Sequence, residues 1–317
     1  MKYKLILSSL LILILIACIK QESQYSLQNN DMKWIEFKWD SDSLSGKFFD
    51  KMSIMIPVKI DSIPDQFYMQ FDLGADVNIL YGNPLINIIN EFPYLSSKIQ
   101  KDSINLGDNF WLKEINLKLG DQNSQINDYV VLKDYGSEKS FANLETIGTI
   151  GANEMKNKIL MIDFPEQKIA ILDSIPYDLR DIFQIENCKL NRNRVIFDCL
   201  INSENYRFMF DTGSSITPVV TNKEIYEKLT GKQKLKPDTL TGYSWGRKLI
   251  IPGALNNFEI HYGENVILKR NMVYYTDDEK SLDFFKTENI DGLIGNSYFF
   301  NSVILIDFKE GKFGIRK

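Results

Sequence analysis

The chain contains very little histidine and cysteine: among its 317 residues there are one histidine, His261, and three cysteines. A hydrolase that pairs a serine or cysteine nucleophile with a histidine base could use only His261, and no Gly-x-Ser-x-Gly stretch accompanies it. Zinc sites built from several histidines are excluded, and three scattered cysteines do not form a metal-binding cluster. The sequence therefore predicts no metal site, and we expect His261 to be an ordinary strand residue.

Basic residues are not in excess either. The chain has 37 basic and 42 acidic residues and a formal charge of −5, whereas nucleic-acid binding requires a basic surplus or a basic stripe. Hydrophobic residues make up 44% and charged residues 25% of the chain, as in ordinary globular proteins. We therefore expect no nucleic-acid partner. The chain is long enough for two domains that each have their own core.

A hydrophobic run at the N-terminus, from Leu5 to Ala17, is too short to span a membrane comfortably. Lysines precede it and Cys18 follows it, as in the lipobox of bacterial lipoproteins. The sequence predicts a signal peptide over residues 1–17, a lipid on Cys18 that anchors the protein to the membrane, and a polar tether over residues 18–30. The protein is then an exported lipoprotein of the cell envelope, facing the periplasm or the cell surface. The alternatives are a plain signal peptide or an N-terminal anchor helix.

An exported protein meets an oxidising compartment, so a disulfide between Cys188 and Cys199 has to be considered. If residues 191–193 make a hairpin turn, Cys188 faces a position near residue 196 rather than Cys199. We therefore expect these two cysteines not to pair.

Alternating hydrophobic residues predict a chain made mainly of β-strands. Two of these strands end in an aspartate two residues before a glycine: Phe67–Phe71 leads into Asp72, and Tyr206–Phe210 leads into Asp211. Helix starts are predicted soon after each aspartate, with Asn83 and Thr221 as the N-terminal residues.

The two aspartates belong to an internal repeat. An offset of 139 residues superimposes Asp72 on Asp211, and an offset of 144 superimposes Gly151 on Gly295 and aligns the following residues without a gap. Each half thus carries Asp-x-Gly, then a helix, then a hydrophobic-hydrophobic-Gly segment.

This duplicated pattern resembles the pepsin/retropepsin superfamily of aspartic proteases, over residues 45 to 317. The second half is similar to the family's Asp-Thr-Gly-Ser-Ser form. The first half is similar to the retroviral Asp-Thr-Gly-Ala-Asp form, except that Leu73 replaces the threonine. The resemblance implies an all-β protein with a bilobal pepsin-like fold, made of two retropepsin-like barrel lobes at residues 31–175 and 176–317.

The resemblance also implies that Asp72 and Asp211 form a catalytic pair in the cleft between the lobes. Two carboxylates about 3 Å apart share one proton, so one can accept a proton from water while the other polarises the peptide carbonyl. In the family, the threonine hydroxyls of the two motifs link the lobes. Leu73 has no hydroxyl, so we expect Thr212 to need another partner. The expected supporting residues are Gly74, Ala75, Thr212, Gly213 and Ser214, with Ser214 a candidate hydrogen-bond donor to the Asp211 carboxylate.

A hairpin tip is predicted at residues 241–246. It is a candidate flap over the cleft, with Tyr243 or Trp245 touching substrate; the alternative is an aromatic surface turn. Residues 107–111 are the weaker candidate for a flap in the first half.

Three functions stay open at this point. The first is a membrane-anchored aspartic endopeptidase that acts as a monomer on peptide or protein substrates and needs no cofactor. The second is a pepsin-like lipoprotein that binds peptides or protein partners with weak or lost turnover, as the replacement at Leu73 suggests. The third is a structural β-rich surface lipoprotein. We predict weak proteolysis, because both aspartates are present; a carboxylate separation above about 6 Å with no shared water would count against a catalytic pair.

Overall fold

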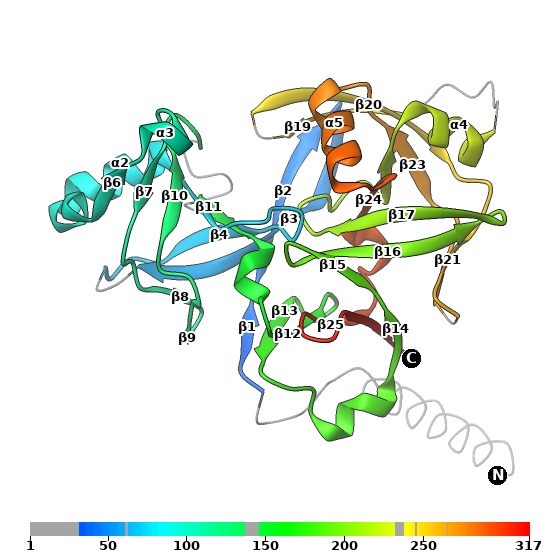
Figure 1. Cartoon of the computed structure of the whole chain (residues 1–317), viewed down its shortest axis with the longest axis horizontal. Coiled ribbons are helices and arrows are strands. Elements are labelled where there is room, and N and C mark those ends of the chain that lie inside the picture. The colour runs from blue at the N-terminus through cyan, green and yellow to red at the C-terminus, as the bar shows by residue number, and fades with distance from the viewer. Residues whose placement is uncertain (1–31, 61–62, 137–145, 232–237, 245, 265) are drawn as a thin grey trace, which may run out of the picture. The chain divides into compact units, whose positions relative to one another are not determined.

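The computed structural model describes residues 32–60, 63–136, 146–231, 238–244, 246–264 and 266–317 (Figure 1). The predicted signal peptide, Cys18, the tether over residues 18–30 and Trp245 lie outside these residues. Among the helices of the described part, none is long and apolar enough to cross a membrane.

About half of the described chain is β-strand and much less is helix, as the alternating pattern predicts, and two large mixed sheets dominate it. The first sheet contains, in spatial order, β6 (Ile99–Lys101), β7 (Phe110–Leu112), β10 (Tyr129–Leu132), β5 (Ile79–Tyr81), β11 (Thr146–Ile150), β4 (Phe67–Phe71), β3 (Lys47–Ile60), β8 (Leu117–Leu119) and β9 (Gln122–Asn123), with β2 (Lys38–Leu44) paired to β3.

The second sheet repeats this order with strands from the second half of the chain. It contains β19 (Asp238–Ser244), β20 (Arg247–Leu255), β23 (Met272–Tyr275), β18 (Val219–Thr221), β24 (Gly292–Gly295), β17 (Glu204–Asp211), β16 (Arg194–Ile201), β21 (Ile260–Tyr262) and β22 (Val266–Leu268), with β15 (Lys189–Asn191) paired to β16. Each strand of the first sheet therefore has a counterpart at the same place in the second, so the repeat found in the sequence is also a repeat of the strand order.

A third sheet joins the two halves. Its order is β1 (Trp34–Glu36), β13 (Lys168–Leu172), β12 (Ile159–Asp163), β25 (Val303–Asp307), β26 (Lys312–Arg316) and β14 (Phe183–Asn187). The central pair is antiparallel, with Met161 opposite Leu305, and all residues of β12 and β25 are buried. One hydrophobic cluster extends through this sheet into both halves. The domain boundary predicted at residue 175 falls between β13 and the next helical turn.

Helices are few and short in the described residues. They are α2 (Gly82–Glu91), α3 (Ser103–Leu106), α4 (Lys223–Thr230) and α5 (Glu279–Glu288), with 3₁₀ turns η1 (Pro93–Lys98), η2 (Ala152–Met155), η3 (Tyr177–Ile182) and η4 (Asn296–Tyr298). Helices α2 and α4 follow the matching strands β5 and β18, which places them at equivalent points of the two halves.

The N-caps of both helices differ from the predicted residues. The N-cap of α2 is Tyr81 rather than Asn83, because the Asn83 side chain donates to the carbonyl oxygen of Gly136 at 2.8 Å. The N-cap of α4 is Asn222 rather than Thr221, and its side chain accepts from the Ile225 amide. Thr221 instead belongs to β18, where its hydroxyl donates to the carbonyl oxygen of Asp291.

Cys188 and Cys199 are free thiols in the structure. Cys199 lies on β16 opposite Tyr206 and Tyr262, and Cys188 immediately precedes β15. Burial raises the pKa of the Cys188 thiol to about 12 and also raises that of Cys199. Both thiols are therefore poor nucleophiles in the folded protein.

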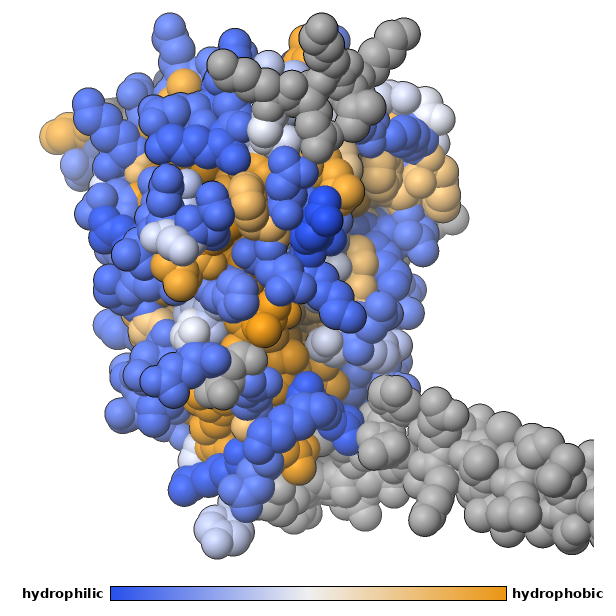
Figure 2. All heavy atoms as spheres, turned by 90° about the vertical axis from the view of Figure 1, so that its right-hand side faces the viewer, coloured by the Kyte–Doolittle hydropathy of each residue, from blue (hydrophilic) through white to orange (hydrophobic). Residues whose placement is uncertain are grey.

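Hydrophobic residues are also present on the surface. On the face drawn in Figure 2, hydrophobic side chains gather in the middle and are surrounded by hydrophilic ones. Exposed large hydrophobic residues of the second sheet include Leu200, Leu255 and Ile267. Scattered exposure of this kind is normal for folded proteins and does not by itself mark a binding surface.

Candidate active site

The structure brings Asp72 and Asp211 together from equivalent positions of the two sheets. Asp72 directly follows β4, and Asp211 is the last residue of β17. A Cβ atom placed on Gly74 would lie 2.6 Å from Oδ1 of Asp211 and 3.0 Å from Oδ1 of Asp72. Two atoms that each lie within 3.0 Å of one point are at most about 6 Å apart. The two carboxylates therefore lie close together, with Gly74 beside both of them.

The hydrophobic-hydrophobic-Gly segments lie beside the strands that carry the aspartates. β11 runs parallel to β4 with Ile150 opposite Phe71, and β24 runs parallel to β17 with Ile294 opposite Phe210. The Asp72 amide donates to the carbonyl oxygen of Ile150 at 3.0 Å. The segments that the sequence pairs by repeat thus contact the aspartate loops directly.

Each carboxylate is fixed by amides of its own loop. Oδ1 of Asp72 accepts from the amides of Gly74 and Ala75, at 2.9 and 3.2 Å. Oδ1 of Asp211 accepts from the Gly213 amide at 2.8 Å. Because these donors belong to the main chain, the carboxylates are oriented without any basic side chain.

Gly74 and Gly213 are required by space. A Cβ on Gly213 would lie 2.6 Å from Cγ of Asp72, much as a Cβ on Gly74 would meet Asp211. Each glycine of one half therefore lies against the aspartate of the other half. A side chain at position 74 would contact both carboxylates, and one at position 213 would collide with that of Asp72.

The two carboxyls titrate as a pair, and the pKa of each is raised. Burial raises the pKa of Asp72, while hydrogen bonds from Asp211 and from the loop amides oppose the rise. Burial, the charge of Asp72 and a hydrogen bond to Asp72 together raise the pKa of Asp211 well above its usual range. Two carboxyls this close share one proton.

Thr212 links the two aspartate loops through a partner that the sequence did not reveal. Its hydroxyl donates to the carbonyl oxygen of Phe71 at 2.9 Å and accepts from the Leu73 amide at 2.8 Å. Thr212 and Leu73 are both fully buried, and Leu73 packs in the main hydrophobic cluster. The main chain around Asp72 thus satisfies the hydroxyl that was expected to lose its partner at Leu73.

Ser214 acts differently from the prediction. Its hydroxyl bonds the hydroxyl of Thr217, and the main-chain amide of Ser214, rather than the side chain, approaches Asp211. Ala75, also predicted to support the site, contributes its amide to Asp72 and accepts at its carbonyl oxygen from the Ala152 amide at 2.8 Å.

Asn296 was not predicted. Its side-chain amide donates to the carbonyl oxygen of Thr212 and to the hydroxyl of Ser215, both at 2.8 Å. Asn296 directly follows Gly295 of the repeated segment and is fully buried. Its position next to a repeated glycine was the only sequence signal that could have identified it.

The tip of the β19–β20 hairpin approaches the first half of the chain. A Cβ on Gly246, at the tip, would lie 3.6 Å from the ring of Tyr135. Burial raises the pKa of Tyr135, and the charge of Asp72 raises it further. The sequence did not predict this approach of Tyr135 to the hairpin.

Tyr243 on this hairpin is 72% exposed, as a substrate-contacting residue or a simple surface residue would be. Among the described residues, the first-half candidate at 107–111 has no contact with the carboxylates: Gly107 ends α3, and Trp111 on β7 packs under Lys113.

The first half also contacts the edge strand β19. The Thr241 amide donates to the Ser45 hydroxyl at 2.8 Å, and Lys47 Nζ pairs with Asp238 Oδ1 at 2.6 Å. Phe49 packs against the cluster formed by Leu240 and its neighbours. The β2–β3 hairpin thus fixes the base of the β19–β20 hairpin.

Metal-binding clusters of three or more histidine, cysteine, aspartate or glutamate side chains do not occur among the described residues. His261 lies on β21 opposite Leu200 and Ile267, and its side chain is exposed.

No family model and no curated protein matches the chain.

Proposed function

We propose that this chain is an aspartic endopeptidase with a bilobal pepsin-like fold, in which Asp72 and Asp211 activate the water that hydrolyses a peptide bond. The observation that carries the proposal is the meeting of two carboxyls from matching loops of the two halves, each with a raised pKa. The common strand order of the two large sheets and the sheet that joins them support a two-lobed architecture.

The single shared proton gives the two carboxyls different roles in the proposed reaction. Charged Asp72 takes a proton from the water as its oxygen attacks the peptide carbonyl carbon. Protonated Asp211 gives its proton to the carbonyl oxygen, which yields a neutral tetrahedral intermediate. Asp72, which now holds the proton from water, gives it to the amide nitrogen. The C–N bond then breaks as Asp211 takes a proton from a hydroxyl of the intermediate, so the carboxyl pair again holds one proton.

The substrate is a peptide or an exposed protein segment that lies between the carboxylates and the β19–β20 hairpin. Gly246 and Tyr135 approach one another there, and Tyr243 is free to contact a bound chain. In this proposal Cys18 carries a lipid, which anchors the peptidase to a membrane of the cell envelope. The peptidase acts as a monomer.

Peptide cleavage by the full-length chain in detergent tests the proposal. A peptide library is incubated with the wild type, Asp72→Asn and Asp211→Asn from acidic to neutral pH, with and without a pepstatin-type inhibitor. We expect each substitution to lower the cleavage rate on the order of 10³-fold or more. Asp121→Asn, an exposed turn residue, is the matched control and should retain full activity.

Two results would overturn the proposal. Cleavage that survives Asp211→Asn belongs to a contaminant or to another site. An absence of cleavage at every pH, together with tight binding of the pepstatin-type inhibitor, identifies a peptide-binding protein without turnover.

A further inference from the structure

A buried polar cluster lies behind the Asp72 loop. It consists of Asn78, which is 3% exposed, and Glu154 in η2, which is 2% exposed. The Asn78 side-chain amide donates to Oε2 of Glu154 at 2.9 Å, and Oδ1 of Asn78 accepts from the Gly151 amide at 2.8 Å. Asn78 therefore connects Glu154 to the repeated glycine that crosses the Asp72 loop.

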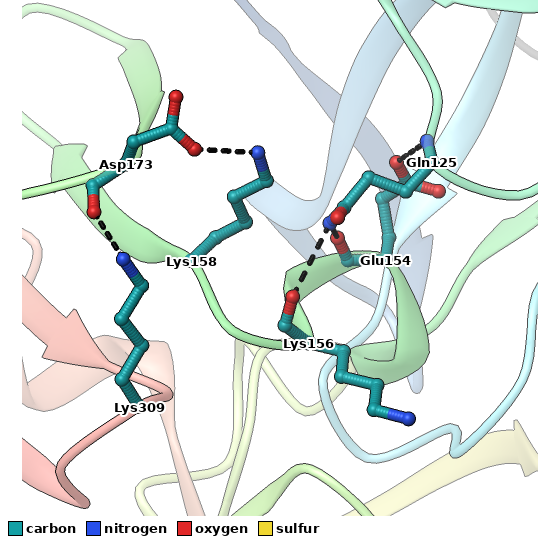
Figure 3. Close-up of polar contacts among 6 residues, drawn as sticks. All are labelled: Gln125, Glu154, Lys156, Lys158, Asp173 and Lys309. Atoms are coloured by element: carbon teal, nitrogen blue, oxygen red, sulfur yellow. Dashed lines mark hydrogen bonds and ion pairs between the residues drawn. The ribbon is translucent and has the colours of Figure 1, made fainter.

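Other donors complete the shell of Glu154. Oε2 accepts from the Ser124 hydroxyl and Oε1 accepts from the Gln125 amide, both at 2.7 Å. Figure 3 shows Gln125 contacting both the side chain and the main chain of Glu154 and reaching the carbonyl oxygen of Lys156. Both carboxylate oxygens are thus satisfied by donors, which fits an acceptor-only group fixed in one orientation.

The glycine segment in turn contacts the Asp72 loop at several points. A Cβ on Gly151 would lie 2.5 Å from the carbonyl oxygen of Val77, so the two main chains are in close contact. On either side of this glycine, the carbonyl oxygen of Ile150 accepts from the Asp72 amide and the Ala152 amide donates to the Ala75 carbonyl oxygen. A shift of Gly151 would therefore move both ends of the loop that carries the Asp72 carboxylate.

In the second half, different groups hold the repeated glycine. The Gly295 amide donates to the main-chain carbonyl of Pro218 at 3.0 Å rather than to a side chain. The carbonyl oxygens of Val77 and Thr217 both lie against the repeated glycine, so Pro218 takes the place of Asn78, and the 144-residue offset places Tyr298 at the position of Glu154. The Asn78–Glu154 cluster thus belongs only to the half in which leucine follows the aspartate.

We propose that Glu154, acting through Asn78, is a positioning residue for Asp72 that holds the Gly151 segment against the aspartate loop. This inference rests on the proposed peptidase function for its kinetic consequence, but the structural connection does not depend on it. The carboxylate oxygens of Glu154 accept from Asn78, Ser124 and Gln125. Its effect is therefore on the geometry of Asp72.

The kinetic test compares Glu154→Gln, Asn78→Asp and the double exchange Asn78→Asp/Glu154→Gln, each as full-length protein at a temperature where all remain folded. Glu154→Gln presents an amide to donors, and Asn78→Asp presents a second carboxylate to Glu154. We expect each single variant to lower kcat about 10- to 100-fold at unchanged KM, since small misplacements of catalytic groups are this costly. The double exchange restores a donor–acceptor pair and should recover most of kcat. Tyr298→Phe, the counterpart in the second half, should leave kcat unchanged.

An exchange measurement separates this inference from the peptidase proposal. Amide hydrogen exchange of residues 148–152 should accelerate at least about tenfold in Glu154→Gln, with residues 292–296 unchanged as the internal control. Faster exchange in a chain whose wild type cleaves no peptide supports the positioning role and defeats only the proposed function. Unchanged exchange, or a kcat loss that the double exchange fails to recover, overturns the positioning role.

Discussion

The hydroxyl of Thr212 binds the main chain on both sides of Asp72, with the Leu73 amide as its donor and the carbonyl of Phe71 as its acceptor. A residue of the second half therefore fixes the aspartate of the first half. The leucine at position 73 contributes its main chain to this link, and its side chain is free to pack in the core. The absence of threonine at position 73 thus leaves one link between the loops in place.

Replacing Thr212 by valine should break this link. The Leu73 amide and the Phe71 carbonyl would lose their partner in a fully buried place, which is expected to lower the free energy of unfolding by about 2–4 kcal/mol. Urea unfolding followed by fluorescence measures the change. Thr212→Ser keeps the hydroxyl and should cost about 1 kcal/mol, the value for a lost buried methyl group. Equal losses in the two variants would show that the hydroxyl contributes nothing.

Leu73→Thr should not increase activity. The leucine side chain is fully buried in the main cluster, and threonine would lose apolar contacts and bury a hydroxyl, at a cost of about 2–3 kcal/mol. Peptide cleavage at saturating substrate and thermal unfolding would be measured together. A gain in kcat would contradict this expectation and would identify position 73 as a site of decayed catalysis.

Asp211→Asn should stabilise the protein at neutral pH while it abolishes cleavage. The folded-state pKa of Asp211 is raised, so its contribution to stability is complete below the unfolded value near 3.8 and is lost as pH rises through the folded value. Asparagine removes this loss and can still donate to Asp72. We expect Tm of the variant to exceed that of the wild type at pH 7 and the difference to shrink at pH 3. Asp121→Asn, at an exposed turn, should show no such pH dependence, and a lower Tm for Asp211→Asn at pH 7 would refute the raised pKa.

Lys47→Ala should loosen the β19–β20 hairpin with little effect on global stability. The Lys47–Asp238 ion pair is exposed, so its loss is expected to change the free energy of unfolding by at most about 1 kcal/mol. Amide exchange over residues 239–244 should nevertheless accelerate, because this pair fixes the base of the hairpin to the first half. Lys189→Ala breaks an ion pair of similar exposure on β15 and β16 and serves as the control. Equal exchange over residues 239–244 in both variants would argue against a role for Lys47.

The sequence predicted the features that repeat and missed those that depend on long-range side-chain contacts. Asp72 and Asp211 could be paired from the sequence, because the spacing between the Asp-x-Gly motif and the later glycine segment is similar in the two halves even where their residues differ. The partners of Thr212 could not be predicted, since they are main-chain groups that any residue supplies. The role of Asn78 was hidden because its contacts with Gly151 and Glu154 are 73 and 76 residues distant along the chain.

Local patterns were less reliable than the repeat. Asn83 has the chemistry of a helix cap, but a tertiary contact with Gly136 uses its side chain instead. The Ser214 hydroxyl was expected to reach Asp211, but Thr217 lies closer to it in the same turn. In both cases a short polar side chain had several possible hydrogen-bond partners. The partner found in the structure is not the one that the local sequence pattern favoured.

The two halves belong to one chain, and the pairing of β12 with β25 joins them in one continuous sheet. In an assembly of identical subunits, every substitution appears twice, once in each aspartate loop. Here a substitution changes one loop only. Leucine after one aspartate and threonine after the other, or glutamate behind one loop and tyrosine behind the other, are combinations that a symmetric pair of subunits cannot encode. Joining the two halves in one chain therefore allows each aspartate to have its own environment.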